Sequence, residues 1–176
     1  MTTDQMPVGP TESAAPRRRP RRRRWPWIAV ATSVAVVAVI LVWFQPQKLI
    51  IDDHVNDPEP AGSFIEVARG EFVSREHRTS GVARVLVFDD GRRIVRIDDL
   101  ETSNGPALHV YLSSNPAGGI ESAFDDGSVD LGGLRGNIGS QSYDIPSTAD
   151  ITLTTTVVIW CDRFDAAFGA ADLVAS

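Results

Sequence analysis

The most reactive side chain in the sequence is its single cysteine, Cys161. One cysteine cannot form an intramolecular disulfide or a cysteine-only zinc site, but a thiol can carry electrons or ligate a metal. His77 and His109 are the only histidines after residue 60. A cysteine paired with a histidine could ligate heme iron or a copper ion. The alternative is that Cys161 is a buried small hydrophobic residue without chemistry.

The neighbours of Cys161 leave this choice open. Trp160 could limit the access of solvent to the thiol, Arg163 favours the thiolate, and Asp162 opposes it. An unpaired cysteine in an oxidising compartment is a liability unless it is protected or used.

The strand that carries Cys161 can be predicted from its residue types. Residues 154–161, TTTVVIWC, are apolar on both faces, as in a central strand that is covered on both sides. In that strand Cys161 shares a face with Val157 and Ile159. Residues 107–114, ALHVYLSS, alternate between apolar and polar and predict a second strand with His109 on its polar face.

The rest of the domain also has the residue types of strands. Residues 81–88 and 92–97 flank Asp89-Asp90-Gly91, which predicts a hairpin with an Asp-Gly turn. Only residues 169–175 have a pattern that suggests a helical turn. Short strands between turn residues predict an all-β fold, an antiparallel sandwich or barrel-like domain over residues 63–175.

Searches for standard catalytic and ligand-binding motifs find none in this domain. The glycine-rich segment 131–139, LGGLRGNIG, lacks the lysine-serine pair and the strand–helix context of a phosphate-binding loop. Asp125-Asp126-Gly127 lacks the acidic spacing of a calcium loop, so no metal site is assigned. The absence of a nucleophile elbow argues against a hydrolase.

Before this domain, the charge of the sequence reverses. The net charge of -6 divides into about +5 before residue 25, where seven arginines lie within residues 17–24, and about -11 from residue 45 onward. Residues 1–24 lack hydrophobic periodicity and predict a disordered basic tail. A basic arm can bind nucleic acid, but the segment that follows accounts for the arginines in another way, so no nucleic acid partner is predicted.

Residues 25–44, WPWIAVATSVAVVAVILVWF, predict a single transmembrane helix. These twenty residues carry no charge and would span roughly 30 Å as a helix, with Trp25 and Trp27 at one end and Trp43 at the other. The apolar run exceeds the core of about 7–15 residues in a signal peptide, and no small-x-small cleavage site follows it. An uncleaved anchor is therefore favoured over a cleaved signal.

The arginines before this helix predict its orientation. Basic residues favour the cytoplasmic side, so we expect a single-pass protein of the cell membrane with a cytoplasmic N-terminus and an extracytoplasmic C-terminal domain. Residues 45–62 contain three prolines and several acids, and they predict a stalk between the helix and the domain.

Four segments of the domain together resemble the DM-thirteen family, described as electron-transfer domains. The segments are GEFVSREHRTSGVA (70–83), LETSNGPALHVYLSS (100–114), VDLGGLRGNIGSQSYDIP (129–146) and TVVIWCDRFDAAFGAADL (156–173). The resemblance covers roughly residues 64–174. One departure is Ala107, where many members of the family have an acid after Gly-Pro.

The resemblance implies a β-rich fold and a functional cysteine, here Cys161. In the family this cysteine is proposed to act as a bare redox thiol or to hold a prosthetic group such as heme. His77 is the better candidate for a second ligand because it lies within a family motif, and Trp160 and Tyr143 would shield the site. The cofactor stays open between heme, copper and none.

We therefore expect a membrane-anchored redox or electron-transfer module that uses Cys161 as a thiol or as a cofactor ligand. Such a module would work with a redox partner protein in the cell envelope, and it is an electron-transfer or binding module rather than a stand-alone enzyme. The alternative is a non-catalytic binding or structural module of the envelope in which Cys161 only packs.

Overall fold

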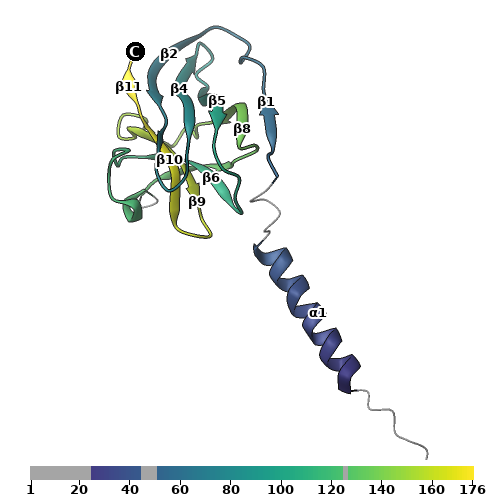
Figure 1. Ribbon diagram of the computed structural model, residues 1–176. Helices are drawn as coiled ribbons and strands as arrows, with labels where there is room; N and C mark the ends of the chain where they lie inside the picture. The colour runs from purple at the N-terminus through teal and green to yellow at the C-terminus, as the bar shows by residue number, and fades with distance from the viewer. Residues whose placement is uncertain (1–24, 45–50, 125–126) are drawn as a thin grey trace, which may run out of the picture. The chain divides into compact units, whose positions relative to one another are not determined.

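The computed structural model describes residues 25–44, 51–124 and 127–176, and these residues form one long helix and a domain of β-strands (Figure 1). The predictions for residues 1–24 and for the first part of the stalk, 45–50, lie outside the described residues.

Helix α1, Trp25–Phe44, has the bounds expected from the uncharged segment. It is long and apolar enough to cross a membrane by length and composition, a test that a signal sequence also passes. Its side chains from residue 25 to residue 42 are exposed, and the Thr32 hydroxyl donates a hydrogen bond to the Ile28 carbonyl within the helix. A polar side chain that is satisfied in this way suits an apolar surrounding.

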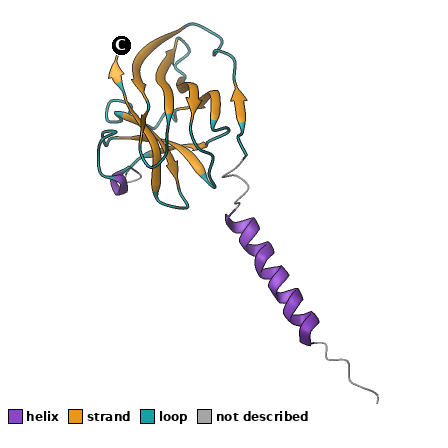
Figure 2. Ribbon diagram, viewed as in Figure 1, coloured by secondary structure: helices purple, strands orange, loops and turns teal. Residues whose placement is uncertain are grey.

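The strands form two sheets, which confirms the all-β sandwich predicted from the sequence (Figure 2). The six-stranded sheet has the order β1-β8-β5-β4-β2-β11. Its strands are β1 (His54–Asn56), β2 (Phe64–Glu71), β4 (Ser80–Phe88), β5 (Arg93–Glu101), β8 (Ile138–Asp144) and β11 (Val174–Ala175).

The five-stranded sheet has the order β3-β10-β9-β6-β7. Its strands are β3 (Val73–Ser74), β6 (Leu108–Ser113), β7 (Val129–Gly133), β9 (Thr156–Cys161) and β10 (Ala166–Asp172). A short 3-10 helix, η2 (Glu121–Ala123), lies in the connection between β6 and β7. All neighbouring strands are antiparallel except β1 and β8, which are parallel.

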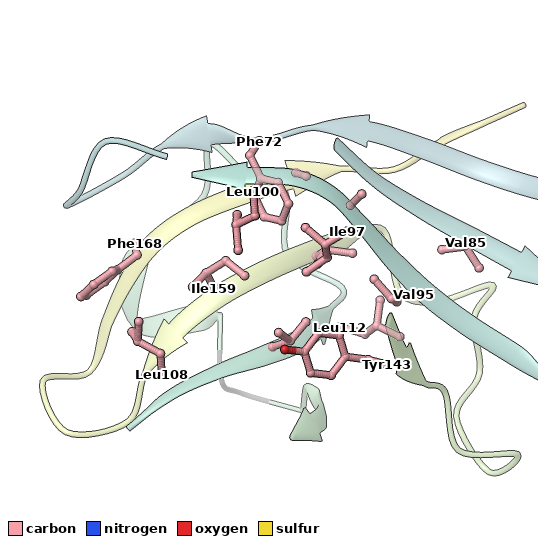
Figure 3. Close-up of a cluster of buried hydrophobic side chains, with 14 of the residues drawn as sticks. Phe72, Val85, Val95, Ile97, Leu100, Leu108, Leu112, Tyr143, Ile159 and Phe168 are labelled. Atoms are coloured by element: carbon pink, nitrogen blue, oxygen red, sulfur yellow. The ribbon is translucent and has the colours of Figure 1, made fainter. Parts of the chain in front are cut away.

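The main hydrophobic core lies between the two sheets and takes side chains from both (Figure 3). Val95 and Ile97 of the six-stranded sheet pack in one cluster with Leu112 and Ile159 of the five-stranded sheet. A second cluster, which contains Val158 and Trp160, covers the outer face of the five-stranded sheet. Every residue of β9 is therefore buried, as predicted for a central strand covered on both sides.

The predicted hairpin is confirmed, with β4 and β5 paired around a turn in which the Gly91 amide donates to the Phe88 carbonyl. The helical turn expected over residues 169–175 is wrong, because this segment forms the end of β10 and all of β11. Alanines favour a helix, but here pairing with β9 and β2 decides the local structure.

The second part of the predicted stalk lies within the six-stranded sheet. Strand β1 pairs with β8 from the glycine-rich segment, and the Asn137 side chain accepts from the Asp53 amide and donates to the Asp52 carboxylate. Arg96, only 3% exposed, donates to the carbonyl oxygens of Asp57 and Pro58. Buried polar groups of the domain thus have their hydrogen-bond partners in residues 52–58. The domain therefore begins about ten residues before residue 63, the start expected from the sequence.

Candidate functional site

Cys161 is the last residue of β9, and its side chain points into the main core. Its Cα partners are Leu108 on β6 and Ala166 on β10, and it belongs to the same cluster as Val157 and Ile159. The side chain has no exposed surface. The shared face predicted for these three β9 residues is confirmed.

The segment Gly105-Pro106-Ala107 lies against this end of β9. The Cys161 thiol donates to the Pro106 carbonyl at 3.2 Å, and the Asp162 amide donates to the Ala107 carbonyl at 3.1 Å. Gly105 has little room for a side chain, because a Cβ there would lie 3.0 Å from the ring of Phe168. Both Gly105 and Pro106 are buried, so this segment closes the thiol off from solvent.

This environment raises the pKa of the Cys161 thiol. Burial is the main cause, because the thiolate would lose its hydration. The backbone amides of Arg163 and Phe164 act in the opposite direction, and the nearby charges of Asp162 and Arg163 oppose each other. Cys161 is therefore held as a neutral thiol, unlike the activated cysteines of thiol-exchange enzymes.

His77 lies beside the cluster that contains Cys161 but makes no hydrogen bond to the thiol. Its ring lies against the ring of Phe168, with the centroids 3.8 Å apart and the planes tilted by 33°. Phe168 in turn packs with Leu108 and Ile159 (Figure 3). The assignment of His77 as a ligand stays a prediction.

His109 lies on the opposite face of the five-stranded sheet from Cys161. It alternates with the core residues Leu108 and Val110 on β6, as the pattern predicted. Its Nδ1 lies 3.1 Å from the Asp130 carboxylate and its Nε2 lies 3.5 Å from that of Asp162. Both carboxylates lie on the outer face of the sheet with His109, so the sheet itself separates His109 from the thiol.

Trp160 and Tyr143 do not provide the shield expected from the sequence. Trp160 lies in the cluster on the outer face of the sheet, away from the thiol. Tyr143 packs in the main core, where its hydroxyl donates to Gln141 Oε1 at 2.7 Å. The segment Gly105-Pro106-Ala107 covers Cys161 instead. The sequence did not predict this cover, because the thiol contacts a backbone carbonyl, which every residue has.

The residues around Cys161 do not fit a heme iron or a copper ion in this arrangement. Across the described residues, no three side chains of His, Cys, Asp or Glu come together to hold a metal. The hydrogen bond from the thiol goes to a backbone carbonyl, while His77 contacts a phenyl ring and His109 faces the other way. A bare thiol is the form that this geometry supports.

Sequence reasoning also missed a cluster on the outer face of β6 and β9. The Tyr111 hydroxyl donates to Asp162 Oδ1 at 2.7 Å, and the rings of Tyr111 and Trp160 stack with their planes 22° apart. The alternation of β6 indicates that His109 and Tyr111 share a face, but only the strand register places His109 opposite Trp160 and Tyr111 opposite Val158.

A family model described as "Electron transfer DM13" matches residues 71–173, which include Cys161, His77 and the outer-face cluster. No curated protein and no solved structure matches the chain.

Proposed function

Since the chain belongs to the Electron transfer DM13 family, we propose that it is a membrane-anchored electron-transfer module in which Cys161 is the redox-active group. The match over residues 71–173 is the observation that carries this proposal, because it covers the whole five-stranded sheet, including the strand that holds the only cysteine, and strands β4, β5 and β8 of the other sheet.

The burial of Cys161 favours electron transfer over thiol–disulfide exchange. Exchange requires a thiolate to attack a disulfide sulfur, so it needs both an accessible sulfur and a low pKa. Cys161 has neither, because its side chain is fully buried and burial raises the pKa of its thiol. Electron transfer needs no contact between the sulfur and its partner, so a partner protein in the cell envelope that supplies a one-electron oxidant need only dock on the surface. Oxidation would break the S–H bond of Cys161: one electron passes to that oxidant, the proton is released to solvent, and the thiol becomes a thiyl radical that the reverse step converts back to the thiol.

We propose that α1 anchors this module with the β domain outside the cytoplasm. The helix has twenty uncharged residues, and seven arginines precede it. In intact cells, a tag at the C-terminus should bind its antibody, whereas a tag at the N-terminus should bind only after permeabilisation. Replacing the seven arginines by glutamine should give a mixed orientation, because the positive-inside signal is then lost.

The redox proposal is tested by titrating the full chain in detergent against mediators of known potential. The wild-type protein should take up and release electrons, and Cys161→Ser should lose this response while its circular dichroism stays unchanged. Val157→Ala is the matched control, because Val157 is buried on the same face of β9 and has no redox chemistry. Equal titrations of wild type and Cys161→Ser would refute the role of Cys161.

The same preparation answers the question of a cofactor. Protein made in a host supplied with heme and copper should show only tryptophan and tyrosine absorption before and after dithionite. A Soret or thiolate–copper band that disappears in Cys161→Ser would contradict the bare thiol.

The second candidate is a non-catalytic binding or structural module, and the complete burial of Cys161 is the observation that favours it. A packing role predicts that the thiol reacts with a labelling reagent only after denaturation and that the folded protein shows no redox response. Because Cys161 is buried under both hypotheses, labelling only after denaturation is expected in either case. The redox titration against mediators therefore distinguishes the two hypotheses.

A further inference from the structure

Tyr111 and Trp160 form a stacked pair on the outer face of the five-stranded sheet. Their ring centroids are 6.5 Å apart and their planes differ by 22°. Trp160 is 2% exposed, whereas Tyr111 is half-buried and reaches the surface. The pair thus joins a buried ring to one that reaches the surface, and Trp160 is linked to Cys161 by one peptide bond, although their side chains lie on opposite faces of β9.

Tyr111 differs from the other tyrosine of the chain in its hydrogen-bond acceptor. Its hydroxyl donates to Asp162 Oδ1 at 2.7 Å, while that of Tyr143 donates to the amide oxygen of Gln141, also at 2.7 Å. A carboxylate can accept the phenolic proton as a base, and an amide oxygen only accepts a hydrogen bond. Since a phenol loses an electron readily only when its proton also leaves, Tyr111 is the tyrosine placed for oxidation.

The carboxylate of Asp162 has a further polar neighbour. Its Oδ2 lies 3.5 Å from His109 Nε2, and His109 Nδ1 lies 3.1 Å from Asp130. The side chain of Asp130 is 48% exposed, so this line of groups ends at solvent. A proton that reaches Asp162 therefore has neighbouring groups through which it can leave.

We propose that Tyr111 and Asp162 form a proton-coupled redox pair and that Trp160 connects this pair electronically to the interior. Trp160 first gives one electron to a one-electron oxidant, a metal centre or an oxidising radical. Tyr111 then returns one electron to Trp160 while its O–H bond breaks and the proton binds Asp162 Oδ1. In sum, the phenol, the carboxylate and the oxidant become a tyrosyl radical, a carboxylic acid and the reduced oxidant. The reverse step restores both side chains.

This inference deepens the proposed function and rests on it for one point, the assignment of Cys161 as the interior end of the route. The chemistry of the pair itself depends only on the contacts of Tyr111, Asp162 and Trp160. An external oxidant can therefore test the pair without using Cys161.

The experiment is flash oxidation of the full chain in detergent by a ruthenium tris-bipyridine complex and a sacrificial electron acceptor. The background carries Trp25→Phe, Trp27→Phe and Trp43→Phe, which leaves Trp160 as the only tryptophan. We expect a tryptophan radical that decays as a tyrosyl radical forms. Optical absorption and electron paramagnetic resonance detect the two radicals. Transfer should be slower in D₂O, because the proton moves with the electron.

Tyr111→Phe should keep the stacked ring but lose the tyrosyl radical, so that the tryptophan radical persists. Asp162→Asn keeps a hydrogen-bond acceptor but not a base, and it should slow tyrosyl formation about a hundredfold, the usual contribution of a positioned base. Tyr143→Phe is the matched control and should behave as the wild type. Circular dichroism of each variant confirms that the domain is folded.

A tyrosyl radical that survives Tyr111→Phe or disappears in Tyr143→Phe would overturn the proposal. So would an unchanged rate in Asp162→Asn. Cys161→Ser separates the two hypotheses: a normal tyrosyl signal with an unchanged mediator titration would refute the role of Cys161 and leave the pair intact. If Cys161→Ser loses the mediator titration but the wild type shows no tyrosyl signal, the role of Cys161 stands and the pair of Tyr111 and Asp162 is refuted.

Discussion

Gly139 and Val55 face each other across the parallel pair of β8 and β1, and no side chain fits between them. Gly139 has a φ of +105°, and a Cβ at this position would collide with the Val55 carbonyl oxygen. Gly136 is similarly constrained, since a Cβ there would lie 2.6 Å from the Asp53 carbonyl oxygen. The two glycines of the segment 131–139 that contact β1 thus form the surface on which β1 docks.

Gly139→Ala should destabilise the domain by about 3 kcal/mol, because backbone strain adds to a clash with main chain that cannot move aside. Gly132→Ala is the control, since Gly132 has a φ of +113° and nothing lies within 4 Å of its Cβ position. The control should lose only about 1–2 kcal/mol. Urea unfolding of both variants measures the difference, and equal losses would mean that docking of β1 contributes nothing.

A protein that starts at residue 62 should be less stable than one that starts at residue 51, by about 3 kcal/mol or more. The shorter protein lacks β1 and leaves the Arg96 guanidinium, which is almost fully buried, without the carbonyl oxygens of Asp57 and Pro58. Thermal and urea unfolding of the two proteins provide the comparison. Coincident transitions would show that residues 51–61 are a stalk after all.

Ala107→Gly should stabilise the domain by about 1 kcal/mol. Ala107 has a φ of +59°, a conformation that is strained for a residue with a Cβ, and its exposed side chain contributes little packing. Ala107→Asp should also be tolerated, since aspartate adopts this conformation more readily than most residues. Ala107→Val should destabilise, because a β-branched residue is least suited to it. A gain in stability for the valine variant would contradict the backbone geometry.

The stability of the domain should fall at alkaline pH partly because of Cys161. The thiol of the unfolded chain titrates at about pH 8.5, and burial raises the pKa of Cys161 in the folded state. Above the unfolded pKa, the unfolded chain releases a proton that the folded domain keeps, so unfolding becomes more favourable as the pH rises toward the folded pKa. Below the unfolded pKa this contribution to stability is fully present.

Urea unfolding from pH 7 to pH 10 measures this effect as the difference between wild type and Cys161→Ser. The wild type should lose more stability than the variant over the upper part of the range. Parallel curves would indicate that the thiol titrates alike in both states.

The regular strands were predictable because each has a pattern with one physical explanation. Residues 154–161 are apolar at every position after Thr156, and β9 is covered on both faces. The hairpin of β4 and β5 follows from Asp89-Asp90-Gly91. Strand β10 was not predictable in this way, because its alanines, such as Ala170 and Ala171, favour a helix locally. Small residues in this strand instead permit close packing, since a Cβ on Gly169 would meet Thr79 at 2.5 Å.

The site was predictable only where it depends on alternation along one strand. The shared face of Cys161, Ile159 and Val157 follows from the period of two. The contact of the thiol with Pro106 and that of Tyr111 with Asp162 join residues 55 and 51 positions apart. Such contacts depend on the register between strands, which no local pattern specifies.

The lengths of the outermost strands bear on how copies of the domain behave at high local concentration. Strands at the margin of a sheet expose unpaired backbone groups on which another chain can add, which is a common start of aggregation. In the described residues, the six-stranded sheet ends in β1, three residues long, and β11, two residues long, and one margin of the five-stranded sheet is β3, also two residues long. Templates this short give a neighbouring copy few backbone groups to join, so these three margins resist the addition of another chain.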